Sequence, residues 1–326
     1  MYLERHVAVP LRRAVHSRQP VLVQGPRGAG KTALARHEFP DHAYVTLDDP
    51  AVRRDPAEAL RRLRGPAIID AVHRAPGVID GGSAHIYLSS LRLAADIPTL
   101  ELHPPTRAER QRRAALPLET IGRFAPSGRL SAGDPPPWPS NRAFLDLDLP
   151  ALIHVHDRAR FERFLAVAEA RSGAVLDQQA LAREAAVSHR TVVRWLEVLR
   201  ATFQIVLLEP YGESFGRRVV RRPKMHFLSG VESFESEVVS EIYRNARHAG
   251  LEAEFCYWRD SNGLEVALVV DGIPVGLAAE GNPKAEAAAL RWAELAGLPH
   301  AAMITRRPPL LGRRAGRLLR YAIGQI

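Results

Sequence analysis

The sequence is poor in cysteine and lysine and has no long apolar run. Cys256 is the one cysteine among 326 residues, so no disulfide can form within the chain, which favours a reducing, cytoplasmic location. No stretch approaches the roughly 18 apolar residues of a membrane-spanning helix. The N-terminus, Met-Tyr-Leu-Glu-Arg, also lacks the apolar core of a signal peptide. We therefore expect no membrane partner.

Positive charge comes almost wholly from arginine. Lysine occurs only as Lys31, Lys224 and Lys284, yet the net charge is +9. A basic chain attracts polyanions, which makes duplex DNA a candidate partner. A GC-rich coding bias toward arginine is an equally good explanation of the excess. The 46% hydrophobic and 25% charged content is typical of a soluble globular protein, and the length predicts two or three domains.

One segment has the pattern of a phosphate-binding loop, G-x-x-x-x-G-K-[ST]. It runs Gly25, Pro26, Arg27, Gly28, Ala29, Gly30, Lys31 and Thr32, between an apolar run at 21–23 and a helical pattern. Glycine lets the backbone turn so that N–H groups and the helix N-terminus converge on an anion. We expect all eight residues to bind a nucleoside triphosphate, with Lys31 at the β- and γ-phosphates and Thr32 at Mg²⁺. A glycine-rich turn that opens an ordinary helix is the alternative.

The second element that phosphate chemistry needs is an acidic residue at the end of an apolar strand, and the run Pro66-Ala-Ile-Ile-Asp70 supplies it. Asp70 is at a sensible distance after the loop to help Thr32 hold Mg²⁺. A positioned acid or base beside it would contribute roughly 10²–10⁴ in rate. The next residue is Ala71, whose methyl group cannot accept a proton. We therefore expect slow or absent hydrolysis, unless Glu101 or Asp80 supplies the missing carboxylate.

Residues 1–105 alternate short apolar runs with helical segments. Strands are expected at 21–24, 43–47, 67–70 and 85–88. This pattern predicts an α/β domain with a doubly wound parallel sheet, the fold of a P-loop nucleotide-binding domain. Residues 106–150 are rich in proline and arginine and predict a lid or linker, with one helix near 107–115.

Residues 151–228 predict a winged helix-turn-helix domain. Helical patterns at 161–171, 177–188 and 189–199 precede two apolar runs that would form the wing. The start of the last helix supplies the candidate DNA contacts Ser188, His189, Arg190, Thr191 and Arg194. Wing arginines at 217, 218, 221 and 222 would add contacts to phosphates. Winged helices also act as protein-docking lids, so protein binding is the alternative.

Residues 229–326 predict a third, small α/β domain. The expected order is a helix at 232–248, strands at 253–258, 264–270 and 273–279, a helix at 283–296, a strand at 301–305 and a basic final helix. The turn Ser261-Asn-Gly263 between two apolar runs suits a hairpin connection.

With these motifs the chain resembles bacterial and archaeal AAA-type ATPases that carry a winged helix and a C-terminal restriction-nuclease-like domain of unknown function. The matching pieces are residues 25–32, 47–50, 68–70, 74–76, 181–199, 222–227, the helix around Glu235 and Glu241, and residues 257–266. The resemblance implies ATP as the nucleotide and Mg²⁺ as its metal. It also implies nucleotide sites that lie between subunits, and hence a homo-oligomer or a partner ATPase subunit.

The departures from that family are also informative. Members have Asp-Glu at Asp70-Ala71, Gly-Ser at Ser89-Ser90 and a Gly-Arg pair where this chain has Ala95-Asp96. The nuclease metal positions correspond to Ala267, Gly276 and Ala278, so no carboxylate is left to hold a cation. The resemblance thus implies a degenerate member with no nuclease activity expected. A DNA-binding regulatory protein and a non-catalytic partner subunit are the alternatives to a weak ATPase.

Overall fold

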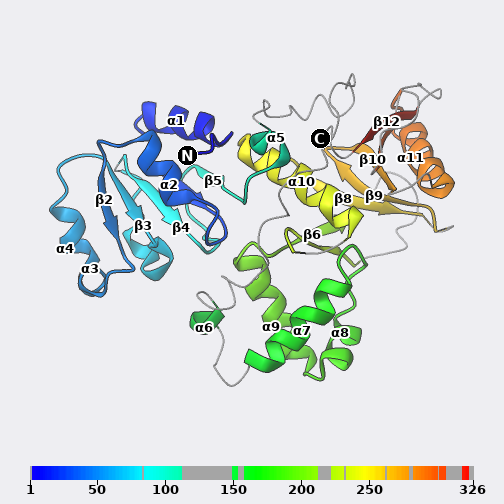
Figure 1. The fold of residues 1–326 in the computed structure, drawn as a ribbon, viewed down its shortest axis with the longest axis horizontal. Coiled ribbons are helices and arrows are strands. Elements are labelled where there is room, and N and C mark those ends of the chain that lie inside the picture. Colours follow the sequence, from blue (N-terminus) through cyan, green and yellow to red (C-terminus); the bar gives the residue numbers. More distant parts are fainter. Residues whose placement is uncertain are drawn as a thin grey trace.

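The computed structural model has an N-terminal lobe with a parallel sheet, a helical lobe, and a C-terminal lobe with a mixed sheet (Figure 1). The N-terminal and C-terminal lobes lie side by side, and hydrogen bonds join the helical lobe to both of them. The structure describes residues 2–82, 84–111, 149–152, 158–211, 222–230, 233–260, 263–278, 282–299, 301–305 and 318–322.

The N-terminal sheet is parallel and has the strand order β2-β3-β4-β1-β5. Its strands are β1 (Val21–Gln24), β2 (Ala43–Thr46), β3 (Ala67–Asp70), β4 (Ile86–Ser89) and β5 (Thr99–Glu101). The four strands predicted in this region are confirmed to within one residue at each end. Because all five strands run the same way, their carboxyl ends meet at one edge of the sheet, where β1 and β3 end in Gln24 and Asp70.

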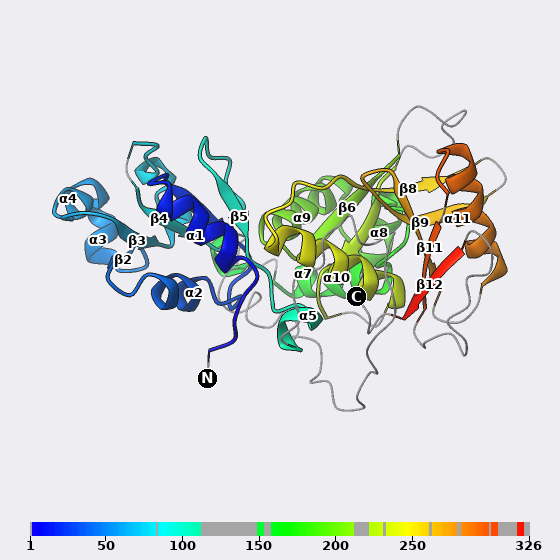
Figure 2. The same cartoon turned by 90° about the horizontal axis from the view of Figure 1, so that it is seen from above.

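Helices cover both faces of this sheet (Figure 2). On one face α1 (Ala8–His16) and α2 (Lys31–Glu38) pack against Val21 and Val23. On the other face, side chains from α3 (Pro50–Arg54) and α4 (Pro56–Arg61) pack around Leu22. Alternate residues of one strand thus enter two separate cores, as expected for a buried strand in a layered α/β domain.

The helical lobe contains α6 (Leu149–Leu152), α7 (Arg158–Ala170), α8 (Gln178–Ala185) and α9 (His189–Ala201). Asp177 and Ser188 cap the N-termini of α8 and α9 by accepting backbone N–H groups. The lobe's core surrounds Trp195, which is fully buried and packs edge-on against Phe161. The three helices predicted here are confirmed, with boundaries shifted by a few residues.

The C-terminal sheet has the strand order β12-β11-β10-β9-β8-β6-β7. Its strands are β6 (Ile205–Pro210), β7 (Lys224–Phe227), β8 (Phe255–Arg259), β9 (Glu265–Val270), β10 (Ile273–Ala278), β11 (Ala301–Thr305) and β12 (Leu318–Ala322). The β6–β7 pair, expected as a wing, joins this sheet because the end of β6 pairs with β8. The domain boundary predicted at residue 228 therefore crosses a continuous sheet.

Two helices sandwich the C-terminal sheet. On one face α10 (Phe234–His248) packs against Tyr257 and Leu268. On the opposite face α11 (Pro283–Leu295) packs against Cys256 and Val269. Cys256 lies in β8 and is a buried core residue.

One predicted element is wrong. A basic helix was expected at the end of the chain, but residues 318–322 form strand β12, parallel to β11. The open edge of β11 offers unpaired backbone groups, and pairing with them outweighs the helical preference of the local sequence. Of the predicted 106–150 segment, residues 112–148 lie outside the described residues, and α5 (Arg107–Arg110) is the start of its expected helix. The wing arginines 217, 218 and 221 and the turn residues 261–262 also lie outside them.

Among the described helices, none combines the length and the apolar character that a bilayer crossing requires.

Candidate functional site

Residues 25–32, here called the glycine loop, connect β1 to α2 at the carboxyl edge of the N-terminal sheet. Gly28 and Gly30 have φ angles of 81° and 94°, in the left-handed region that favours glycine. Gly25 is required for another reason: a Cβ there would lie 1.9 Å from the carbonyl oxygen of Leu102 on the chain after β5. The glycines therefore allow both the tight turn and its close contact with the sheet.

Lys31 is folded back over the glycine loop. Its Nζ donates to the carbonyl oxygens of Gly25 at 2.7 Å and Pro26 at 2.9 Å, and the residue is 8% exposed. Arg27 and Gly28 are more exposed than the buried Ala29. The ammonium group is thus held at the mouth of the loop by backbone carbonyls that an anionic ligand could replace.

Thr32 and Asp70 meet at the carboxyl edge of the sheet. The Thr32 hydroxyl donates to Asp70 Oδ2 at 2.6 Å, although the two residues are 38 positions apart. Tyr44 also donates to Asp70 Oδ2, at 2.9 Å, from the neighbouring strand β2. A hydroxyl and a carboxylate oxygen beside a lysine form an oxygen-rich set suited to a hard divalent cation next to a phosphate.

Ala71 follows Asp70 in a left-handed conformation, with a φ of 59°, and its side chain is buried in the core between the sheet and α4. Its backbone N–H donates to Asp70 Oδ1 at 2.7 Å. Nearby, His73 contacts Ser90 at the end of β4, with 3.3 Å between Nε2 and Oγ. The family resemblance did not suggest this histidine, since the spacing between positions 73 and 90 carries no motif.

The two carboxylates considered as substitutes for the missing acid have other partners. Glu101 Oε2 lies 3.0 Å from His103 Nε2 and accepts from Tyr243 Oη at 3.2 Å, and Glu101 also pairs with Arg92. Burial would raise the pKa of Glu101, but the hydrogen bond from His103 and the charge of Arg92 lower it to about 2. The charge of Asp80 opposes the lowering of the His85 pKa by burial, so the two side chains are close. His85 lies at the amino end of β4 and therefore at the other edge of the sheet. Neither replaces a carboxylate at position 71.

Arg5, which the sequence analysis missed, supports the glycine loop from behind. Its guanidinium donates to the carbonyl oxygens of Ala29 at 2.8 Å and His103 at 2.6 Å, and it lies 3.3 Å from Glu109 Oε1. The side chain is 5% exposed. Buried arginines satisfy several acceptors at once because their five N–H groups form a rigid fork. This contact spans 24 residues, so no local pattern could reveal it.

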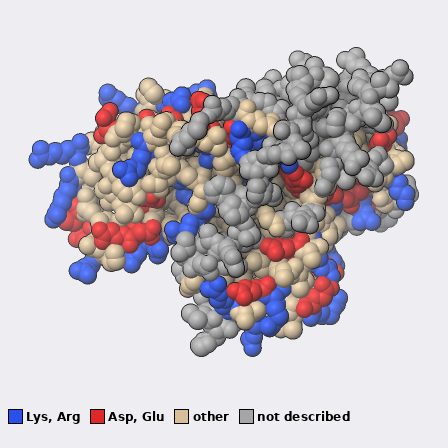
Figure 3. All heavy atoms as spheres, in the orientation of Figure 1, with Lys and Arg blue, Asp and Glu red and all other residues tan. Residues whose placement is uncertain are grey.

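The predicted DNA-contact residues lie together at the start of α9. Ser188 is the N-cap and accepts from the backbone N–H of Thr191 at 3.1 Å. His189 Nε2 lies 3.0 Å from Gln178 Oε1 on α8, and the side chains of Arg190 and Arg194 are exposed. On the visible face, basic and acidic side chains of this lobe are intermixed rather than separated into one basic surface (Figure 3).

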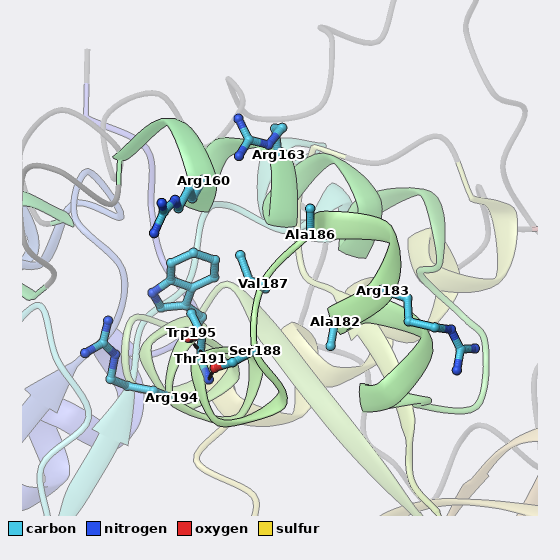
Figure 4. A pocket seen from close by; sticks show the side chains of 10 residues that line it. All are labelled: Arg160, Arg163, Ala182, Arg183, Ala186, Val187, Ser188, Thr191, Arg194 and Trp195. Atoms are coloured by element: carbon cyan, nitrogen blue, oxygen red, sulfur yellow. Dashed lines mark hydrogen bonds between the residues drawn. The ribbon is translucent and has the colours of Figure 1, made fainter.

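Three predicted DNA-contact residues also line a cavity that the sequence analysis missed (Figure 4). The cavity has a volume of about 710 Å³ and lies between α7, the α8–α9 turn and α9. Its lining is Arg160, Arg163, Ala182, Arg183, Ala186, Val187, Ser188, Thr191, Arg194 and Trp195. We call it the arginine pocket.

The positions that the family resemblance matches to nuclease metal ligands lie in strands β9 and β10 of the C-terminal sheet. Ala267 packs in the core beneath α10. A Cβ on Gly276 would lie 2.5 Å from Met303 Sδ and 3.2 Å from Ala289 Cβ on α11, so close packing favours glycine there. Ala278 ends strand β10. Among the described residues no cluster of three or more histidine, cysteine, aspartate or glutamate residues could hold a metal ion.

Comparison with known proteins gives similarity without a function. Residues 141–229 match a family model described as a domain of unknown function, DUF8612, which contains the arginine pocket. The chain is also similar to two uncharacterized proteins, one from Mycobacterium bovis and one from Mycobacterium tuberculosis. Each is 28% identical over 330 residues, covering 85% of this chain and 74% of the relative.

Proposed function

We propose that this protein is an ATP-binding protein of the AAA type that binds ATP with Mg²⁺ through the glycine loop. The observation that carries the proposal is the 2.6 Å hydrogen bond from Thr32 to Asp70, beside a loop whose lysine is held in place by loop carbonyls. The parallel sheet with helices on both faces supports a P-loop fold for this lobe.

The residues present fit this ligand. Lys31 would release its carbonyl partners and bind phosphate oxygens, while the glycine loop would supply backbone N–H groups. Thr32 and Asp70 would hold Mg²⁺, which neutralises phosphate charge when bound. Tyr44 would orient Asp70 through its hydrogen bond to the same carboxylate oxygen.

Weak or absent hydrolysis is the second part of the proposal. Position 71, where the AAA-type family carries the acid that polarises the attacking water, is here an alanine with a buried side chain, and Glu101 is engaged with Arg92, His103 and Tyr243. Without positioned acid–base help, the rate is expected to be lower by roughly 10²–10⁴. The chain would then act through nucleotide binding, either alone or as a partner subunit beside an active ATPase.

The test is equilibrium binding of labelled ATP with Mg²⁺ to the full chain and to Lys31→Ala. We expect the substitution to weaken binding by about 100-fold, because a charge-assisted contact to phosphate contributes roughly 2–3 kcal/mol. Lys284→Ala removes an exposed lysine of α11 and is the matched control. Absence of binding to the unaltered chain would refute the proposal. Phosphate release near the typical enzyme turnover of about 10 s⁻¹ would refute weak hydrolysis.

Duplex DNA binding by the helical lobe is the second candidate function. It is favoured by the exposed Arg190 and Arg194 on α9, which begins at a capped N-terminus. Contacts from several arginines to phosphates would make the affinity fall steeply with salt. An affinity for duplex DNA that does not depend on salt, or no affinity at all, would favour protein docking by this lobe.

A further inference from the structure

The lining of the arginine pocket is strongly basic. Its lining includes four arginines, from α7, α8 and α9, and among the described residues it includes no carboxylate. A ligand that pairs with these arginines would therefore carry negative charge.

The polar groups of the lining are mainly hydrogen-bond donors. Guanidinium groups only donate, and their planar fork matches the oxygens of a phosphate group. Trp195 adds an indole N–H, which also only donates. The matching ligand is thus rich in acceptor oxygens.

Trp195 provides an independent indication of a ligand. The residue is fully buried, and its Nε1 has no hydrogen-bond partner in the described part of the chain. Buried donors are nearly always paired, because an unpaired one loses its hydrogen bond to water without replacement. Figure 4 shows this nitrogen on the side of the pocket where Arg160 and Arg194 lie. An acceptor atom bound there would satisfy it.

We propose that the arginine pocket binds phosphate groups, with Arg160, Arg163 and Arg194 pairing with their oxygens and Trp195 donating from the pocket wall. The volume of about 710 Å³ is within the range of small-molecule sites and would accommodate a nucleotide-sized ligand. The site is separate from the glycine loop, so it does not depend on ATP binding there.

The phosphate can come from two sources. One is a free phosphorylated small molecule that enters the pocket. The other is the backbone of a DNA duplex, because Ser188, Thr191 and Arg194 belong both to the pocket lining and to the predicted DNA-contact set. Arg160 and Arg163 on α7 would then extend the phosphate contacts beyond α9.

The test uses the full chain carrying Lys31→Ala, so that the glycine loop does not contribute to phosphate binding. Inorganic pyrophosphate is titrated by calorimetry, and a short labelled duplex by fluorescence anisotropy over a range of salt concentrations. The variant is Arg160→Ala with Arg163→Ala, two exposed residues whose truncation leaves the core intact. Arg200→Ala, an exposed arginine at the other end of α9, is the matched control.

We expect the double substitution to weaken the binding of at least one probe by about tenfold or more, whereas Arg200→Ala leaves that affinity unchanged. Loss with pyrophosphate identifies a free phosphate ligand. Weaker binding of the duplex identifies the DNA backbone, provided that the slope of log affinity against log salt concentration also becomes smaller by about 2. The indole N–H resonance of Trp195, assigned by its absence in Trp195→Phe, should shift with the bound probe.

Two results would overturn the proposal: binding of neither probe, or binding that the double substitution leaves unchanged. Both results leave the ATP proposal untouched, because Lys31 is already replaced. Conversely, failure of the unaltered chain to bind ATP would leave the arginine pocket standing.

Discussion

At the scale of single residues, contacts from outside the glycine loop define its shape. Leu102, after β5, presses against Gly25, and Arg5 holds the carbonyl of Ala29. The sequence predicted the loop because its glycines, lysine and threonine stand at fixed spacings. Arg5 and Tyr44 were missed because their partners lie 24 and 26 residues away, where no spacing rule applies.

We predict that Gly25→Ala disrupts the loop. A methyl group 1.9 Å from the Leu102 carbonyl oxygen would force β1 and β5 apart, since Leu102 N–H also donates to Gln24. The free energy of unfolding should fall by about 2–3 kcal/mol, the usual effect of inserting an atom into a packed site. Chemical denaturation measures it. Gly77→Ala is the control, because a Cβ there meets nothing within 4 Å; equal effects of the two substitutions would contradict the prediction.

Arg5→Ala should be more damaging. It leaves two carbonyl oxygens and the buried Glu109 without their cationic partner. Breaking a buried ion pair typically costs about 3–5 kcal/mol in unfolding free energy. Arg5→Lys should recover only part of this, since an ammonium cannot reproduce the fork.

The control for Arg5 is Arg61→Ala, which removes an exposed pair with Glu58. Exposed pairs contribute about 0–1 kcal/mol, so this variant should have an unfolding free energy close to that of the parent. If urea titrations showed Arg5→Ala and Arg61→Ala to be equally stable, the support of the loop by Arg5 would be refuted.

At the scale of helices and strands, most of the fold could be predicted from the sequence. Apolar runs predicted the strands of both sheets except β5 and β12, and helical patterns predicted α7, α8, α9, α10 and α11. The pairing of β6 with β8 could not be predicted, since it depends on how the two lobes meet. The terminal strand β12 was missed for the same reason: its partner edge on β11 is a tertiary feature.

Lys224 links strand β7 to helix α10 and strand β9 through two carboxylates. From β7 its Nζ donates to Glu235 of α10 at 2.8 Å and also pairs with Glu265 of β9, and the lysine is 3% exposed. Lys224→Met should lower the unfolding free energy by about 3 kcal/mol at pH 7, because two carboxylates lose their shared cation.

This deficit should depend on pH. Burial and the neighbouring Glu265 raise the pKa of Glu235, whereas Lys224 opposes the rise. Without Lys224 the folded form binds a proton more readily than the unfolded form, so the variant gains stability as pH falls. Denaturation at pH 7 and pH 5 should show the deficit shrinking. Lys284→Met, which removes an exposed lysine, should stay within about 0.5 kcal/mol of the parent, and a deficit independent of pH would contradict the prediction.

At the scale of the whole molecule, buried polar groups join the N-terminal and C-terminal lobes. The backbone N–H of His103 donates to Nε2 of His248 on α10 at 2.9 Å. An amide can only donate, so that nitrogen is unprotonated and the ring proton is on Nδ1, 3.1 Å from Glu109 Oε1. Since Arg5 contacts both Glu109 and Ala29, the network links the glycine loop to α10.

We predict that the free energy of unfolding falls in acid because two buried histidines resist protonation in the folded protein. Burial, with Arg5 and His103 nearby, lowers the pKa of His248 to about 4, although Glu109 opposes this. Burial and Lys224 lower the pKa of His226 to about 3. Both rings are fully buried. The unfolded chain therefore takes up protons below pH 6.5 that the folded chain does not bind, and folding loses free energy as pH falls.

Each ring should lower the free energy of unfolding by about 2 kcal/mol between pH 7 and pH 5, since one pKa unit is worth about 1.4 kcal/mol. Urea denaturation at half-unit pH steps measures the slope. His248→Gln should reduce that slope by about 1.4 kcal/mol per pH unit, whereas His16→Gln, at an exposed position, should leave it unchanged. An unchanged slope in His248→Gln would mean that this ring is already charged in the folded protein. It could not then accept from the His103 amide, and the link between the lobes would have to run through other groups.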